Sequence, residues 1–180
     1  SEERMQVSAV DISRAYFNAS TEGCPPTYVQ LPAEHPDSER GMCGYLLKHM
    51  YGTQAAADGW QQEYAGYMRE LGFQQGAASP CVFVHAERNL ACSVHGDDFT
   101  SPGSKRNLDW FKAELSKRYE LREEARLGPG AKDDKEGKVL NRIIRWTAEG
   151  YEIEADQRHA EMIVEAMGLD GARGANTPDT

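Results

Sequence analysis

Apolar and polar residues alternate, or apolar residues form short runs closed by Gly or Pro, along most of the chain. Strict alternation is typical of a strand with one buried face, and short β-prone runs between turn residues are typical of buried strands. We therefore expect strands at 5–12, 28–31, 44–52, 82–84, 90–95, 139–146 and 151–153. Tight turns at Gly96 and Gly150 would join neighbouring strands into hairpins.

Three segments instead show the helical period of 3.6 residues. Gly72 stands where a C-terminal cap of the first helix belongs, and the apolar face of that helix is Trp60, Tyr64, Tyr67, Met68 and Leu71. Ser104 can cap the second helix and Asp156 the third, and the tail at 171–180 is rich in Gly, Ala, Thr and Pro and predicted to be loose. Helices interleaved with hairpins predict an α+β fold, in which an antiparallel sheet carries its helices on one face.

The turn after the strand at 90–95 carries two adjacent carboxylates, Asp97 and Asp98. At 4 Å and an effective dielectric of 20, two such charges repel by roughly 4 kcal/mol, so a place at the end of a buried strand favours a cation. The acid pairs at 2–3, 123–124 and 133–134 lie in polar surroundings, and we interpret them as solvated surface charge.

A second strand, at 5–12, reaches an acid at Asp11. If the two strands are neighbours, Asp11, Asp97 and Asp98 meet at one end of the sheet. Carboxylate oxygens of this kind suit Mg²⁺ or Mn²⁺ rather than zinc, and two such ions about 3.5–4 Å apart can support phosphoryl transfer. Three unrelated surface acids are the alternative, and the spacing alone leaves it open.

Composition limits the classes of protein that remain. The chain has 180 residues, 39% of them hydrophobic, which suits one packed domain. Its net charge of -9 argues against a general nucleic-acid-binding surface, although a local basic cleft is compatible with it. The four cysteines lack zinc-site spacing, which favours a reducing compartment, and no apolar run approaches the roughly 20 residues that span a bilayer.

The segment Asp11–Ala19 resembles the first palm motif of reverse transcriptases in copia-type retrotransposon polyproteins. Further matches follow in the family's order, at 28–32, 47–52, 60–73, 79–83, 96–98, 157, 168–169 and 177–178. The resemblance implies an antiparallel, ferredoxin-like palm sheet over 1–170, followed by the loose tail. It also implies an RNA-directed DNA polymerase that transfers dNTPs to a primer 3′-hydroxyl with two Mg²⁺ or Mn²⁺ ions.

The same resemblance implies roles for individual residues. Asp11 and Asp97 would be catalytic metal ligands, with Asp98 as a supporting catalytic carboxylate at the metals. Tyr16 would lie under the sugar of the incoming nucleotide and block a 2′-hydroxyl. The chain departs from the family in two places. His95 and Gly96 replace the usual Tyr and Val, and Gln54-Ala55 replaces a Lys-Gln pair. Gln54 is therefore a candidate for nucleotide binding that is displaced by one position from the family's glutamine.

The implied partners are an RNA or DNA template-primer and dNTPs, together with the fingers, thumb and ribonuclease H regions of the same polyprotein, and no membrane. The implied location is the cytoplasm, in virus-like particles, or the nucleus. Because the family's basic fingers segment precedes Asp11 and its thumb follows the palm, we expect these 180 residues alone to extend a primer poorly. Two alternatives stay open: a catalytically degenerate palm that serves as an interaction module, or another palm-type nucleotide-processing enzyme. The chain lacks the Gly-Gly-Asp/Glu-Glu-Phe segment of a nucleotide cyclase, which counts against the second alternative.

Overall fold

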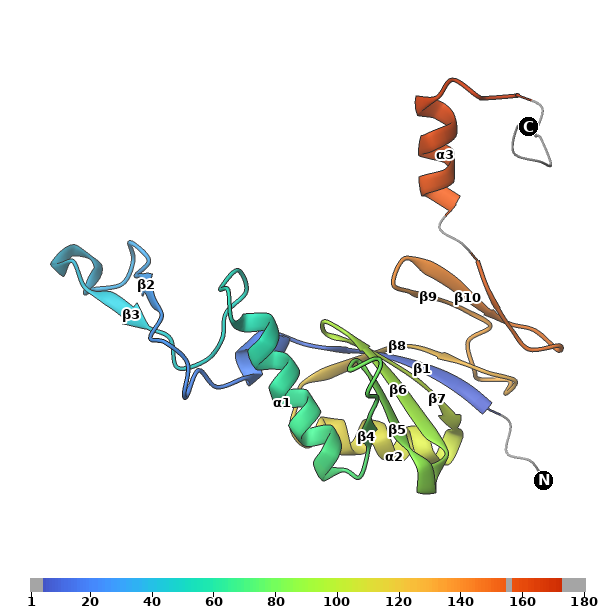
Figure 1. Cartoon of the computed structure of the whole chain (residues 1–180), viewed down its shortest axis with the longest axis horizontal. Helices are drawn as coiled ribbons and strands as arrows, with labels where there is room; N and C mark the ends of the chain where they lie inside the picture. Colours follow the sequence, from blue (N-terminus) through green and yellow to red (C-terminus); the bar gives the residue numbers. More distant parts are fainter. Residues whose placement is uncertain (1–4, 155–156, 173–180) are drawn as a thin grey trace.

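A six-stranded antiparallel sheet forms the centre of the computed structural model, which describes residues 5–154 and 157–172 (Figure 1). Its strand order is β4-β5-β6-β7-β1-β8. The strands are β1 (Met5–Ile12), β4 (Gln74–Gln75), β5 (Val82–His85), β6 (Leu90–His95), β7 (Asp98–Ser104) and β8 (Leu121–Leu127). With α1 (Ala56–Glu70) and α2 (Lys105–Ser116), the chain runs β1-α1-β6-β7-α2-β8, which is the ferredoxin-like βαββαβ order. The α+β fold predicted from the sequence is confirmed.

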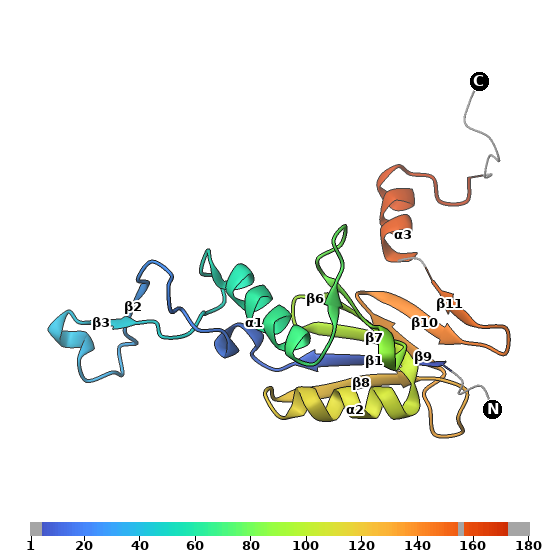
Figure 2. The same cartoon turned by 60° about the horizontal axis from the view of Figure 1, so that its bottom comes forward.

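Both long helices pack on one face of this sheet, as predicted. The residues buried between helices and strands form one cluster, rich in aromatic rings, that includes Val10, Ile12, Trp60, Tyr64, Phe83, Phe99, Leu108 and Phe111. The Ser104 side chain accepts a hydrogen bond from the Asn107 backbone N–H and so caps α2. Gly72 follows α1 with φ 93, a conformation that favours glycine, so both predicted caps are present. In Figure 2, α2 runs along β8.

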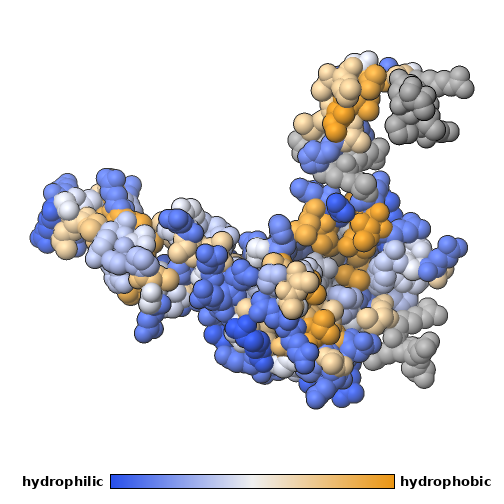
Figure 3. Space-filling model, in the orientation of Figure 1, coloured by the Kyte–Doolittle hydropathy of each residue, from blue (hydrophilic) through white to orange (hydrophobic). Residues whose placement is uncertain are grey.

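The opposite face of the sheet is partly covered by a second, three-stranded sheet of order β11-β10-β9. Its strands are β9 (Glu136–Val139), β10 (Arg142–Trp146) and β11 (Tyr151–Ile153). A small core joins the two sheets, made of Ala9, Ala125 and Leu127 with Val7, Val139, Ile144 and Tyr151 around it. Figure 3 shows apolar side chains gathered over this region and on the helix beyond it.

Two strand predictions need correction. The run at 139–146 is not one strand, because Leu140 and Asn141 both adopt positive φ and turn the chain back between β9 and β10. The run at 44–52 is also wrong: only Cys43–Tyr45 is a strand, β3, paired with β2 (Tyr28–Gln30). Among the residues that the structure describes, no strand lies alongside the apolar residues after Tyr45 to continue the pairing, apart from a single bridge between Ser20 and Lys48. Strand β8 was not predicted, because its charged residues hide the alternation.

Two further parts extend from the central sheet. The β2–β3 arm, with the short helix η2 (Ser38–Arg40), projects on one side, and α3 (Gln157–Ala166) stands apart on the other (Figure 1). Short 3-10 helices also occur at η1 (Ala15–Asn18) and η3 (Ala86–Arg88). The predicted third helix is therefore present, and Gly168 follows it with φ 64. Its proposed cap, Asp156, and most of the tail at 171–180 lie outside the described residues.

Candidate functional site

The acidic turn between β6 and β7 is a tight hairpin that is hydrogen-bonded to a buried residue of the core. Gly96 and Asp97 form the connection, Gly96 has φ 63, and Asp98 begins β7 opposite His95. A first turn residue with positive φ is typical of tight hairpins, where glycine adopts it without strain. The indole N–H of Trp60, on α1, donates a hydrogen bond to the Gly96 carbonyl oxygen at 2.8 Å. Since Trp60 is 1% exposed, the helix fixes the turn that carries the acids.

The register between β1 and β7 brings the predicted acids together. Asp11 lies directly opposite Asp98, and the Ile12 N–H donates to the Asp97 carbonyl oxygen at 2.9 Å. Side chains of directly opposed residues project from the same face of a sheet. The predicted pairing of the strands at 5–12 and 90–95 is wrong, because β7 lies between β1 and β6. The acids nevertheless meet as expected, since Asp98 begins β7, and all three aspartates lie at one end of β1 and β7.

These acids face away from the helices. Val10 and Ile12 pack into the helix-side core, as does Phe99, and neighbouring strand residues point to opposite faces. Asp11 and Asp98 therefore point to the face that the β9–β11 sheet partly covers. All three aspartates are half-buried.

A fourth acid reaches the same face through an irregularity in β8. Ala9 pairs with Ala125 and Val10 with Glu123, so Glu124 is an extra residue in a β-bulge. Bulges redirect side chains and are common beside functional sites. Glu124 and Asp98 line a cavity of about 580 Å³, whose other walls are Lys138, Leu140 and Asn141. Sequence reasoning missed Glu124, because a bulge depends on how two strands pair.

The electrostatics of the cluster are those of crowded like charges. Burial raises the pKa of Asp11, and the charges of Asp97 and Glu124 raise it further, while Arg122 opposes them. The pKa of Asp98 is also raised, by burial and then by Asp97, Glu124 and Asp11, with His95 acting against them. A bound cation would relieve this repulsion. Within residues 5–154 and 157–172, no group of three or more acidic, His or Cys side chains is already arranged to enclose a metal ion.

Tyr16 is connected to the acids through a second tyrosine. Tyr16 lies in η1, half-buried against the helix-side core. The ring of Tyr51 contacts it edge-on, with 4.4 Å between ring centroids. Burial raises the pKa of Tyr51, and the charge of Asp97 is the next largest cause, so Tyr51 is within electrostatic reach of the acidic turn. Nothing in the sequence singled out Tyr51 as a site residue.

Gln54 lies elsewhere. It lines a cavity of about 490 Å³ between the start of α1 and the base of the β2–β3 arm. Other walls of this cavity are Thr21, Leu46 and His49, and none of the three aspartates lines it. The structure therefore gathers the acids and sets Tyr16 against Tyr51, but it does not place Gln54 in the cavity that Asp98 lines.

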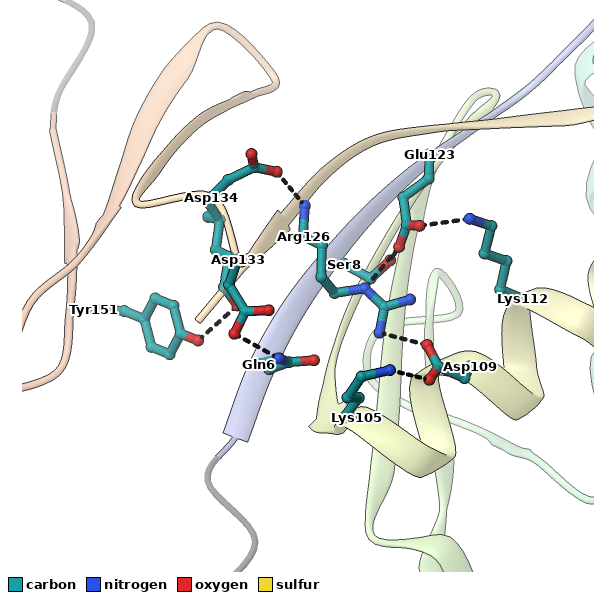
Figure 4. Close-up of polar contacts among 11 residues, drawn as sticks. Gln6, Ser8, Lys105, Asp109, Lys112, Glu123, Arg126, Asp133, Asp134 and Tyr151 are labelled. Carbon is teal, nitrogen blue, oxygen red and sulfur yellow. Dashed lines mark hydrogen bonds and ion pairs between the residues drawn. The ribbon is translucent and has the colours of Figure 1, made fainter. Parts of the chain in front are cut away.

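The other acid pairs differ from their interpretation as solvated charge. Glu123 accepts hydrogen bonds from Lys112, Arg126 and Ser8. Asp133 accepts from the Gln6 amide at 2.6 Å and from a backbone N–H, and Asp134 accepts from the Arg126 backbone N–H (Figure 4). The interpretation is wrong for Glu123 and Asp133, whereas Asp134 is exposed as expected. Together the three residues join α2, β1 and β8 into one polar network. The pair at 2–3 lies outside the described residues.

Comparison with known proteins gives one family. A family model described as "Reverse transcriptase (RNA-dependent DNA polymerase)" matches residues 1–179. No solved structure matches the chain. Among the described residues, no helix is both long enough and apolar enough to cross a membrane.

Proposed function

The chain belongs to the reverse transcriptase (RNA-dependent DNA polymerase) family, and on that premise we propose that it is the palm-centred part of a copia-type enzyme. Its reaction is transfer of dNTPs to a primer 3′-hydroxyl on an RNA or DNA template, supported by two divalent ions. One observation carries the proposal: Asp11 and Asp98 are directly opposed on neighbouring strands, and Asp97 lies in the adjoining turn.

The donor set fits Mg²⁺ or Mn²⁺. Both ions prefer carboxylate oxygens, and Mg²⁺ is usually held by one or two carboxylates, waters and the phosphates of a substrate rather than by a complete protein cage. Asp11 and Asp97 would hold the ions, with Asp98 as the supporting carboxylate. A divalent ion bound there lowers the pKa of an attacking hydroxyl and neutralises charge on the transferred phosphate.

The remaining roles belong to the chain's own side chains. Tyr16 would lie under the sugar and exclude a 2′-hydroxyl by its bulk. Trp60 keeps the acidic turn in place through Gly96. Gln54 stays a candidate contact to the nucleotide or template from its neighbouring cavity. The template-primer, and the fingers, thumb and ribonuclease H regions of a polyprotein, are the proposed partners, in virus-like particles of the cytoplasm or in the nucleus.

The direct test is Mn²⁺-dependent binding of dATP, measured by calorimetry with the purified chain. We expect Asp11→Asn and Asp97→Asn each to weaken Mn²⁺–dATP binding by at least about tenfold, because even partners that only orient a metal ligand are worth 10- to 100-fold. Asp170→Asn is the matched control: this aspartate is exposed beyond α3, and its loss should leave binding unchanged. Equal affinity in all four proteins would overturn the proposal and favour the interaction-module alternative.

A further inference from the structure

Tyr51 forms the outer wall of the aromatic cluster that contains Tyr16. Its ring lies edge-on to Tyr16, with centroids 4.4 Å apart and planes at 70°, and edge-on to Phe17 at 5.8 Å. Edge-to-face rings at such distances attract each other and prefer one mutual orientation. The orientation of the Tyr16 ring therefore depends on Tyr51.

The loop that carries Tyr51 is tied to the segment that carries Tyr16. The His49 N–H donates to the Ala19 carbonyl oxygen at 3.0 Å, and the Lys48 ammonium donates to the Asn18 carbonyl oxygen at 3.0 Å. These contacts join the two backbone segments that carry the rings. The backbone next to Tyr51 is therefore held beside η1.

The charges of the acids also act on Tyr51. After burial, Asp97 is the largest cause of its raised pKa, and Tyr16 and Asp11 contribute in the same direction. A hydrogen bond with the backbone of Ala15 acts against them. The Tyr51 side chain therefore contacts the residue proposed to lie under the sugar and is close enough to Asp97 and Asp11 to be influenced by their charges.

Core packing explains this placement only in part. Tyr51 is 45% exposed, whereas Tyr16 packs against the buried helix-side cluster. A ring exposed to this degree gains less from burial than a core tyrosine does. Its aromatic contacts instead connect two places that the proposed reaction uses.

We propose that Tyr51 is a positioning residue for sugar discrimination, which holds the Tyr16 ring edge-on beside Asp11 and Asp97. The inference rests on the proposed function, because it concerns the step at which a 2′-hydroxyl is excluded. Tyr51 acts through Tyr16 and not by contact with the reacting atoms. Its ring is required for this role, and its hydroxyl is not.

The test compares the Kd of Mn²⁺–dATP with that of Mn²⁺–ATP. Tyr51→Ala should reduce the preference for dATP by roughly 2- to 10-fold, which is the range that one aromatic pair is worth. Tyr51→Phe keeps the ring and should keep the preference. Tyr45→Ala is the matched control, since Tyr45 is a similarly exposed tyrosine that pairs with Tyr28 on the arm, at 5.5 Å between centroids.

A double-mutant cycle tests whether Tyr51 acts through Tyr16. In a Tyr16→Ala background, Tyr51→Ala should change the preference no further. In the nucleotide-free protein, Tyr51→Ala should shift the ring-proton NMR resonances of Tyr16, and Tyr45→Ala should not. Unchanged resonances, or equal effects of Tyr51→Ala in both backgrounds, would overturn the inference.

The outcomes separate this inference from the proposed function. If the wild-type chain binds Mn²⁺–dATP and prefers it over Mn²⁺–ATP, but Tyr51→Ala keeps that preference, the positioning role fails and the proposed function stands. If the wild-type chain binds neither nucleotide with Mn²⁺, the proposed function fails and the role of Tyr51 in it fails with it.

Discussion

Two neighbouring residues of β8, Glu123 and Glu124, lie on opposite faces of the sheet and in opposite electrostatic surroundings. Burial by itself would raise the pKa of Glu123, but hydrogen bonds from Lys112, Arg126 and Ser8 outweigh it, and the pKa is lowered. The Glu123 side chain is 19% exposed, so its charge needs these partners. Glu123 is a structural acid.

Glu124 belongs to the other kind of cluster. Burial raises the pKa of both Asp11 and Asp98, and the charges of Asp97 and Glu124 raise it further. The ion pair between Glu124 and Arg122 is at the surface. The acids on this face are crowded without enough cations to balance them. Since a fold does not gain from like charges placed side by side, uncompensated acids in a cavity are candidates for a functional site, and compensated ones are not.

Arg126 holds the compensated cluster together. Its guanidinium contacts Glu123 at 2.6 Å and forms an ion pair with Asp109 at 3.3 Å, and its backbone N–H donates to Asp134 at 2.8 Å (Figure 4). Lys105 and Lys112, also from α2, pair with Asp109 and Glu123. The network thus joins α2 to the edge strand β8.

The largest expected effect comes from breaking this network. Arg126→Met keeps the aliphatic stem but leaves Glu123 with a single cationic partner. We expect a loss of about 2–3 kcal/mol in the free energy of unfolding, because a mostly buried carboxylate loses a charged hydrogen-bond donor. The measurement is urea denaturation at pH 7. Arg122→Met is the control, because the Arg122 side chain is 74% exposed and should cost less than about 1 kcal/mol. Equal losses in the two variants would mean that the two faces do not differ as described.

A smaller effect separates Glu123 from Glu124 directly. Glu123→Gln should cost about 1–3 kcal/mol at pH 7, because Lys112 and Arg126 lose a charged acceptor, whereas Glu124→Gln should not destabilise the chain. The lowered pKa fixes the pH dependence. The stabilisation by Glu123 is present above its ordinary pKa of 4.5 and is lost as the pH falls through its folded-state pKa. Denaturation at pH 7 and pH 3 should therefore show the cost of Glu123→Gln shrinking in acid, and a constant cost would contradict the assignment.

The sequence predicted the cluster of aspartates but not the opposite roles of Glu123 and Glu124. The alternation of 5–12 and the Gly-Asp-Asp turn predicted β1, the β6–β7 hairpin and the acids at their ends. These features are local, since alternation and turn residues act within a few positions of the chain. The helix caps Ser104 and Gly72 were predictable for the same reason.

The rest depends on contacts between distant segments. Glu123 and Glu124 look alike in sequence, and only the bulge against β1 decides which of them shares the face of Val10 and which shares the face of the aspartates. The run at 44–52 has strand-like composition, but a strand also needs a partner, and in the described part of the chain only the single bridge from Lys48 to Ser20 continues the pairing past Tyr45. Tyr51 became a candidate only when the fold placed its ring against Tyr16.

The smallest expected effect, opposite in sign to the others, tests the uncompensated face. The pKa of Asp11 is raised in the folded chain, so the folded state binds this proton more tightly than the unfolded state does. Stability is then lost as the pH rises from the ordinary value of 3.8 through the raised pKa, because the charged form is the disfavoured one. Asp11→Asn, which imitates the protonated acid, should therefore stabilise the metal-free chain at pH 7. Because Asp11 is only half-buried, solvent screening limits the gain to less than about 1 kcal/mol.

Urea denaturation in EDTA should show this gain in Asp11→Asn at pH 7 and lose it below pH 3.8, while Asp170→Asn should match the wild type at both pH values. Adding Mn²⁺ with dATP should then stabilise the wild type and not Asp11→Asn, since a ligand stabilises only a state that binds it. If Asp11→Asn proved less stable than the wild type at pH 7 without metal, the Asp11 carboxylate would be a structural acid like Glu123, and the contrast between the two faces would fail.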